Sequence, residues 1–227
     1  MNKKTKSIVI ICYIVIAIFS FITMLVVPSL NEVFKKLSSD IPYIMGFIKF
    51  SLLATAGELI AIAISTKEFN APVKVVWRFI IWGFIGVWIT FMMKVLSTAV
   101  ATMMASGALL GGDSVFLKAL YTSVIMNTTF GPTFMAIHKI TDKLLELRAK
   151  KEKANLTNIV KNIDWCGFWN FTILKTVPLF WIPAHTISFL MPENMRVMLA
   201  ALLSIAFGVI VAYYKLIKSN AKVVLSK

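Results

Sequence analysis

The chain has 227 residues, of which 59% are hydrophobic and only 15% are charged, whereas an average soluble domain has about 25% charged residues. This composition excludes an ordinary soluble domain and predicts an integral membrane protein. Its net charge of +14 would indicate nucleic-acid binding in a soluble protein. Here the basic residues gather at the ends of apolar segments, as in membrane proteins, so the sequence predicts no nucleic-acid partner.

Six apolar segments follow one another along the chain, each close to the length of about 20 residues that an α-helix needs to cross the hydrocarbon core. They are 8–28, 43–64, 77–97, 115–137, 166–190 and 195–217. The sequence therefore predicts an all-α, polytopic bundle of about six transmembrane helices, forming a single integral membrane domain over 1–227. Segment 8–28 follows a basic start without a small-residue cleavage site, so we expect a retained first helix rather than a signal peptide.

Lysine and arginine concentrate in the connections 65–76 and 138–164 and near both chain ends. With six spans these stretches fall on one side of the membrane, and the positive-inside rule then predicts that both termini face the cytoplasm. The connection 29–42, on the other side, balances two lysines with Glu32 and Asp40. The cytoplasmic loop 138–164 has leucines and charges at helical spacing, which predicts a short amphipathic helix in contact with anionic lipid.

Two stretches interrupt the regular pattern of apolar segments. The first, 98–114, is rich in small residues and glycine, and fits an extension of the third helix, a re-entrant piece or a loop. The second, 176–196, contains Pro178, Pro183 and Pro192, which predicts a broken membrane helix. Backbone groups freed by proline must find partners in neighbouring helices or line a wet cavity, so this segment marks either a pathway or a kinked packing helix.

Four ionisable side chains are candidates for the interior of the bundle. Glu58 lies about 9 Å from the inner end of its segment at 1.5 Å per residue, and needs a basic partner on another helix. Lys175 is the leading candidate for this partner and Arg78 is the second. His185 lies beside Pro183, where an imidazole could gate a pathway or relay protons near neutral pH. Each of the four also fits a structural role, as an ion pair or a packing residue. Three lysines nearer the segment ends are expected to snorkel to the surface: Lys49, Lys94 and Lys118.

No arrangement of residues indicates an enzyme or a metal site. The two histidines lack the HExxH spacing, no serine stands in a GxSxG turn, and Cys12 and Cys166 are far apart. The sequence therefore predicts neither catalysis nor a metal or other cofactor. An intramembrane enzyme is the lowest-ranked alternative, since it would need a nucleophile near His185, where Thr186 and Ser188 are the candidates.

Four groups of glycine, proline and charged residues occur in a fixed order between residues 51 and 214. They are Gly57-Glu58; Arg78 with Gly83 and Gly86; Gly131-Pro132 with His138-Lys139 and Asp142; and Pro183-Ala184 with Phe189, Pro192 and Arg196. This order resembles the Mpv-seventeen and twenty-two-kilodalton peroxisomal membrane protein family, with segment 8–28 as an addition. Members are small integral proteins of mitochondrial inner and peroxisomal membranes, and some look like weakly selective channels for small solutes, which the resemblance implies here.

We therefore expect a weakly selective channel or facilitator for small solutes or ions, with Glu58, Arg78, Lys175 and His185 facing its interior. The main alternative is a structural or regulatory membrane protein, in which the same charges lock helices together and the loop 138–164 binds lipid or a partner. The lysine-rich sequence without an import presequence favours a prokaryotic plasma membrane, and the family resemblance keeps an organelle membrane as the alternative. Small residues along the helices would allow close packing, and the sequence is also compatible with a homo-oligomer.

Overall fold

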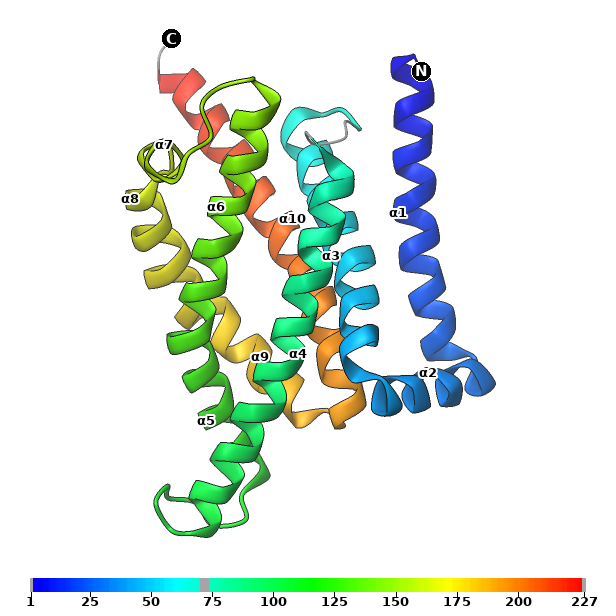
Figure 1. Cartoon of the computed structure of the whole chain (residues 1–227), viewed down its shortest axis with the longest axis vertical. Helices are drawn as coiled ribbons and strands as arrows, with labels where there is room; N and C mark the ends of the chain where they lie inside the picture. Colours follow the sequence, from blue (N-terminus) through cyan, green and yellow to red (C-terminus); the bar gives the residue numbers. More distant parts are fainter. Residues whose placement is uncertain (1, 70–73, 226–227) are drawn as a thin grey trace. The chain divides into compact units, whose positions relative to one another are not determined.

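The computed structural model describes residues 2–69 and 74–225, with the side chains of residue 2 and of 4–69 and 74–213. Every regular element in these ranges is helical (Figure 1), so the predicted all-α class is confirmed. The elements are α1 (Lys3–Val26), α2 (Pro28–Asp40), α3 (Pro42–Thr66), α4 (Val75–Ala105), α5 (Val115–Ile125), the π-helix η1 (Met126–Phe130), α6 (Gly131–Ala149), α7 (Leu156–Lys161), α8 (Trp165–Gly167), the π-helix η2 (Phe168–Trp181), α9 (Ile182–Leu190) and α10 (Glu193–Leu225).

Five helical stretches in the described part of the chain are long and apolar enough to cross a membrane. They are Lys4–Val26, Pro42–Thr66, Val75–Ala105, Trp165–Leu190 and Glu193–Tyr213. These helices support a multi-pass membrane protein. The predicted span 115–137 is helical but is not among the five, because it carries several polar side chains, Thr122, Ser123, Asn127, Thr128 and Thr129. Six spans with both termini in the cytoplasm therefore stay a prediction.

The helices divide into two compact units. The first unit comprises residues 1–86 with 198–227, and contains α1, α2, α3, the first part of α4 and most of α10. The second comprises residues 87–197 and contains the rest of α4, α5 to α9 and the start of α10. The predicted single membrane domain stays a prediction.

In the first unit, α1 and α3 run antiparallel and α2 lies across the end at which they are joined (Figure 1). The sequence predicts a connection over 29–42, but most of this stretch is helical. Pro28 stands at the first turn of α2, where its fixed φ favours helix. Apolar residues then follow at helical spacing: Leu30, Val33, Phe34 and Leu37. Phe34 packs edge to face on Phe21 of α1, with ring centroids 6.3 Å apart, so α2 belongs to the packed structure.

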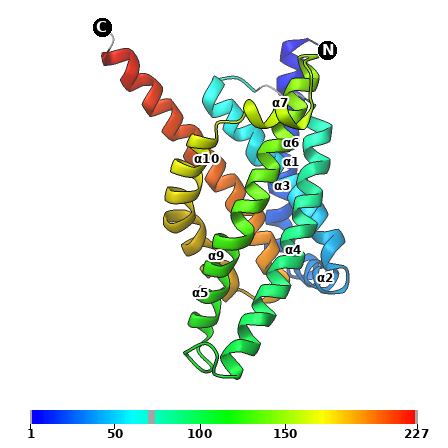
Figure 2. The same cartoon turned by 60° about the vertical axis from the view of Figure 1, so that its left-hand side comes forward.

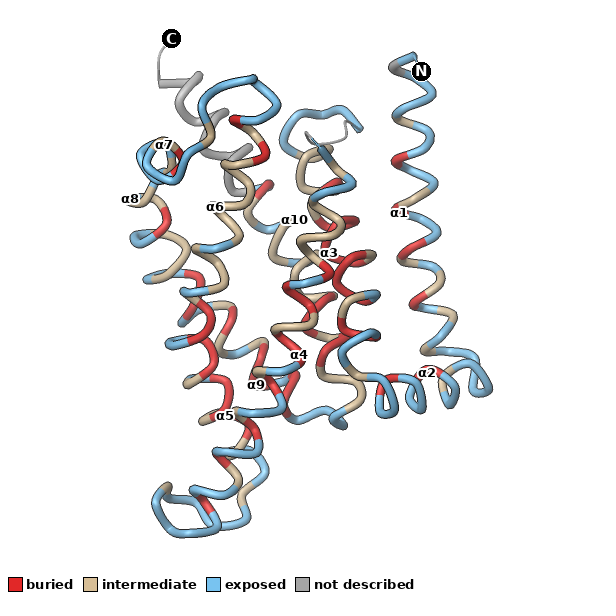
Figure 3. The backbone as a smooth tube through the Cα atoms, in the orientation of Figure 1, coloured by how far each residue is buried: buried red, intermediate tan, exposed pale blue. Residues whose placement is uncertain are grey.

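Glycines bring the helices of the first unit close together. A Cβ atom at Gly57 of α3 would lie 2.9 Å from Ile205 Cα of α10, and one at Gly86 of α4 would collide with the Gly46 carbonyl oxygen of α3. A Cβ at Gly83 would also overlap α3 side chains. The predicted close approach through small residues is thus confirmed at these positions. Figure 3 shows the result as a long buried stretch in the middle of α3.

In the second unit, α4 continues through Ala105, so the first part of 98–114 extends the third predicted helix and the rest is a connection. Gly107 and Gly111 turn the chain there with φ values of 76° and 117°, which only glycine adopts readily. The elements α5, η1 and α6 then follow without a break (Figure 2). Residues 138–149 of the predicted cytoplasmic loop therefore belong to α6, and α7 is a separate short helix.

The segment from α8 to α9 is continuous, so neither Pro178 nor Pro183 breaks the helix. Pro178 lies inside η2, where backbone bonds span five residues, as in the bond from Ile182 N–H to the Val177 carbonyl. Proline lacks the N–H that a regular α-helical ladder would need, so the backbone changes its winding instead of breaking. The predicted break within 176–196 falls at Met191 and Pro192, between α9 and α10.

Candidate functional site

The first polar cluster lies in the first unit and joins α3 to α4. Arg78 Nη1 donates a hydrogen bond to Glu58 Oε1 at 2.6 Å, and Trp82 Nε1 donates to Glu58 Oε2 at 3.3 Å. Arg78 and Trp82 are four residues apart and so share one face of α4. The ion pair of Glu58 is thus formed with the second predicted candidate. We call Glu58, Arg78 and Trp82 the carboxylate cluster.

The charged side chains of the carboxylate cluster are paired but remain partly exposed. The Glu58 side chain is 20% exposed and the Arg78 side chain 11%. Pairing opposite charges lowers the cost of placing them within membrane-spanning helices. The partial exposure leaves room for contact with water or an ion. This arrangement is compatible with both a structural tie between α3 and α4 and a polar surface for a passing solute.

The second polar cluster lies in the second unit and joins η1 to α9. His185 Nδ1 and Asn127 Oδ1 are 3.0 Å apart, and both residues are buried. Asn127 Nδ2 donates to the Ser123 carbonyl at 2.8 Å, and Ser123 Oγ donates to the Ile182 carbonyl at 2.7 Å. We call Ser123, Asn127 and His185 the histidine network.

This network selects one form of the imidazole. Because Asn127 Nδ2 is directed to the Ser123 carbonyl, Oδ1 is the amide atom that faces the ring. An amide oxygen only accepts hydrogen bonds, so His185 must donate from Nδ1. In the neutral ring Nε2 then keeps its lone pair and can accept a hydrogen bond or a proton. The sequence identified His185 but not Asn127.

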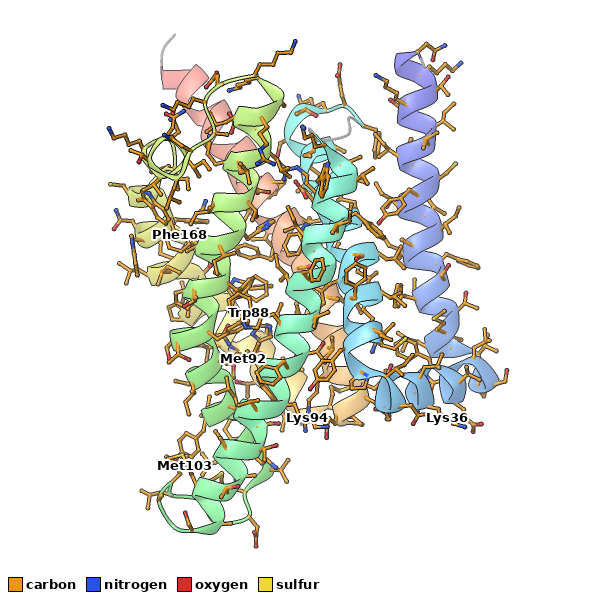
Figure 4. All side chains as sticks on the ribbon, viewed as in Figure 1. Lys36, Trp88, Met92, Lys94, Met103 and Phe168 are labelled. Carbon is orange, nitrogen blue, oxygen red and sulfur yellow. The ribbon has the colours of Figure 1, made fainter. Side chains whose placement is uncertain are left out.

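Two residues of the histidine network, Asn127 and His185, lie in or beside π-helical backbone. Asn127 lies within η1, and His185 lies one turn after the end of η2, with its ring centroid 5.3 Å from that of Trp181. The Trp88 ring of α4, which Figure 4 labels, packs edge to face on Phe130 of η1 with ring centroids 4.9 Å apart. Inserted π-helical turns occur frequently at functional sites, which makes this network a strong candidate for function.

The hydroxyl groups near His185 bond to the backbone. Thr186 Oγ1 donates to the Ile182 carbonyl at 2.8 Å, and Ser188 Oγ donates to the Ala184 carbonyl at 3.1 Å. A nucleophile would be expected to bond to the imidazole. These bonds give the intramembrane-enzyme alternative no support, and the prediction that the protein is not an enzyme stays a prediction.

Two lysines lie in places that the sequence did not indicate. Lys175, the leading predicted partner of Glu58, is exposed on η2. Lys49, which was expected to snorkel, is only 2% exposed, so this expectation is wrong. Its Nζ donates to Ser38 Oγ at 2.8 Å and lies 4.5 Å from the centroid of the Phe34 ring. The helical α2 supplies both contacts, and the sequence did not predict them because it predicted a connection over 29–42.

The third group of motif residues lies in α6, at the start of the helix and further along it. Gly131 and Pro132 begin α6 directly after η1. His138 Nε2 lies 3.6 Å from Asp142 Oδ2 one turn further along α6. Lys139 Nζ lies 5.8 Å from the centroid of the Phe168 ring of η2. These contacts orient the basic end of α6.

The last group of motif residues lies in α9 and at the turn between α9 and α10. Pro183 stands in the first turn of α9. Arg196 Nε donates to the Met191 carbonyl at 3.0 Å, and the guanidinium carbon lies 5.8 Å from the centroid of the Phe189 ring. Pro192 lies between these partners. Arg196 therefore anchors the start of α10.

The basic end of α6 carries a strongly held carboxylate outside the membrane-spanning helices. Hydrogen bonds from Lys143 at 2.6 Å and Lys150 at 2.7 Å lower the pKa of Glu146 to about 2. The hydrogen bond with Glu146 in turn raises the pKa of Lys150. Since lysine and arginine still outnumber the acidic residues over 138–164, this end keeps a positive charge, and the predicted contact with anionic lipid stays a prediction.

Within residues 2–69 and 74–225, no group of three or more histidine, cysteine, aspartate and glutamate residues could hold a metal ion. Cys12 and Cys166 are both exposed thiols. The predicted absence of a cofactor stays a prediction.

Comparison with family models, curated proteins and solved structures gives no match for this chain. The resemblance described above therefore depends on the motif positions alone.

Proposed function

We propose that this membrane protein is a weakly selective channel or facilitator for small solutes or ions. The observation that carries the proposal is the buried histidine network beside π-helical backbone. Polar groups and irregular backbone at membrane depth are tolerated where they are buried in protein or line a water-filled cavity, and they often mark a pathway. The family resemblance supports the same function, and the lysine-rich sequence supports a prokaryotic plasma membrane as its location.

The two clusters suggest why selectivity would be weak. Channels that select strongly by charge use rings of like-charged side chains or of carbonyl dipoles. The carboxylate cluster instead pairs Glu58 with Arg78 and contributes no net charge. In the proposed function it would offer donors and acceptors to small solutes of either charge, while His185 Nε2 would offer an acceptor in the second unit.

A structural or regulatory protein is the second candidate. It is favoured by the hydrogen bonds that both carboxylate oxygens of Glu58 make with α4. In this function the carboxylate cluster ties α3 to α4, and the basic stretch 138–164 binds anionic lipid or a protein partner, without transport.

Solute flux into liposomes tests the proposal. We expect purified protein to raise the permeability to KCl and to small uncharged solutes above that of protein-free liposomes. Asn127→Leu removes the partner of His185 and should lower this flux several-fold. Thr128→Val, at the exposed neighbouring position of η1, is the matched control and should keep it.

Folding is checked by size-exclusion chromatography, with His185→Gln as a second variant if Asn127→Leu does not fold. Absence of flux with folded wild-type protein would overturn the channel proposal and favour the structural candidate. Flux that survives both substitutions would remove the histidine network from the pathway.

A further inference from the structure

The helix α2 lies where two membrane-spanning helices end. It begins two residues after the candidate span Lys4–Val26 and ends two residues before the candidate span Pro42–Thr66. Figures 1 and 2 both show it at the end of α1 and α3 and across their direction. A helix held between the ends of two spans is at the level of the membrane–water interface, whatever the function of the protein.

One face of α2 is fixed against the two spans. Phe34 and Ser38 are buried. Phe34 packs on Phe21 of α1, and Lys49 of α3 lies over the Phe34 ring and donates to Ser38. Contacts with both neighbouring helices prevent α2 from turning about its axis, so its other faces have defined directions.

A second face of α2 is apolar and exposed. Leu30, Val33 and Leu37 are 43%, 56% and 41% exposed. At 3.6 residues per turn their directions fall within about 60° of one another. We call these three residues the apolar row. Exposed apolar residues also precede and follow α2 along the chain, at the end of α1 and the start of α3: Val26, Val27, Tyr43 and Ile44. The exposed apolar character of the two spans thus continues into α2.

The third face of α2 is polar and lies opposite the buried face. Glu32, Lys36 and Asp40 point away from Phe34 and Ser38 at 3.6 residues per turn. All three are exposed, and Figure 4 shows Lys36 on the side of α2 away from α1 and α3. A buried face toward the spans, an apolar flank and a polar face directed outward is the arrangement of a helix lying in a membrane interface.

We propose that α2 is an interfacial helix whose apolar row inserts into a zwitterionic lipid surface. The charge of α2 supports zwitterionic lipid, because Lys35 and Lys36 are balanced by Glu32 and Asp40. Attraction to anionic headgroups needs an excess of lysine and arginine, which this helix lacks. It therefore differs in charge from the basic stretch 138–164, where lysine and arginine outnumber the acidic residues.

Nitroxide labels on single cysteines test this proposal in the full-length protein. Cys12→Ser and Cys166→Ser provide the background, and Val33→Cys, Leu37→Cys and Lys36→Cys provide the labels. In phosphatidylcholine liposomes we expect Val33 and Leu37 to collide with oxygen several-fold more than with a water-soluble nickel complex, at a depth of about 5–10 Å. Lys36, the matched control on the polar face, should show the reverse preference.

Each other outcome would overturn the proposal. Equal access of the nickel complex to Val33 and Lys36 would place the apolar row in water. Spectra of Val33 broadened by a neighbouring label would show that a second copy of the chain covers the row. A depth that increases when phosphatidylglycerol replaces phosphatidylcholine would show that anionic lipid is the partner. None of these outcomes depends on whether the protein transports solutes.

Discussion

The Glu58–Arg78 ion pair makes an energetic prediction at the scale of single residues. Glu58→Gln or Arg78→Gln alone leaves the other charge without this partner in a membrane-spanning helix. Breaking a fully buried pair costs about 3–5 kcal/mol, and the partial exposure here reduces the expected loss to about 1–3 kcal/mol. The double variant should recover part of it, with a coupling energy of about 0.5–3 kcal/mol. Unfolding in detergent micelles measures the four proteins of this cycle.

Lys94 and Glu193 of the second unit supply the matched control for this cycle. Their charged atoms are 3.9 Å apart and both side chains are more than half exposed. Exposed pairs of this kind contribute about 0–1 kcal/mol, so the cycle Lys94→Gln with Glu193→Gln should be nearly additive. An equally additive cycle at Glu58 and Arg78 would contradict a stabilising interaction between these two residues of the carboxylate cluster.

Single residues could be selected from the sequence, but their partners could not. Glu58, Arg78 and His185 stand out because ionisable groups are rare within apolar segments. Asn127 is uncharged, and its contact with His185 spans 58 positions along the chain, so only the packed structure reveals it. As a partner for Glu58, the sequence places Arg78 below Lys175 because of the depth of Lys175 within its apolar segment. Which side chains meet depends instead on which helices pack together.

At the scale of the helices, close packing of α4 on α3 predicts that two glycines of the motif groups differ in their tolerance. Gly86→Ala places a methyl group against the Gly46 carbonyl and within 2.6 Å of Phe50 Cβ. Overpacking of this kind costs about 1–3 kcal/mol. Gly131→Ala meets only ordinary contacts, the nearest at 3.5 Å, and should change stability by less than about 1 kcal/mol, close to the difference in helix propensity.

Thermal unfolding of the two variants in the same detergent checks this prediction. The expected order of stability is Gly86→Ala below wild type, with Gly131→Ala close to wild type. A Gly86→Ala protein as stable as wild type would show that α3 and α4 can separate without loss, and would contradict the close helix contact.

The long apolar helices were easier to predict from the sequence than the helix α2 and the π-helical winding at Pro178. The long apolar segments predicted α1, α3, α4 and α10 within a few residues, apart from the C-terminal ends of α4 and α10, which each extend eight residues further. The helix α2 was missed because two lysines, Glu32 and Asp40 made 29–42 look like a loop, although Phe34 and Leu37 had helical spacing with Leu30. The π-helical winding at Pro178 was not predictable, since proline equally indicates a break.

At the scale of the whole chain, six spans predict the sides on which its connections lie. Cysteines introduced at Asn2 and Glu152 should react from the cytoplasmic side with a membrane-impermeant maleimide, in a background without Cys12 and Cys166. A cysteine at Asp113 should react only from the opposite side. Labelling of Glu152→Cys and Asp113→Cys from the same side would contradict the span 115–137, the segment whose polar residues weaken its membrane signal.

The composition was sufficient to predict the membrane class and the all-α fold, because hydrocarbon requires each backbone group to be satisfied within helices. It was not sufficient to fix the number of spans. The segment 115–137 contains Asn127 and several hydroxyl groups that take part in the histidine network and its helix contacts. These polar residues make the segment a candidate site and also make it less apolar than the other predicted spans.

The most direct test of the proposed channel function is the ion selectivity of wild-type protein and Glu58→Gln in liposomes. Neutralising Glu58 leaves the positive charge of Arg78, so we expect the wild type to conduct K⁺ and Cl⁻ with little preference and the variant to favour Cl⁻. Glu152→Gln, the same chemical change at an exposed position, should behave as wild type. Folded wild-type protein without flux above that of protein-free liposomes would contradict the account.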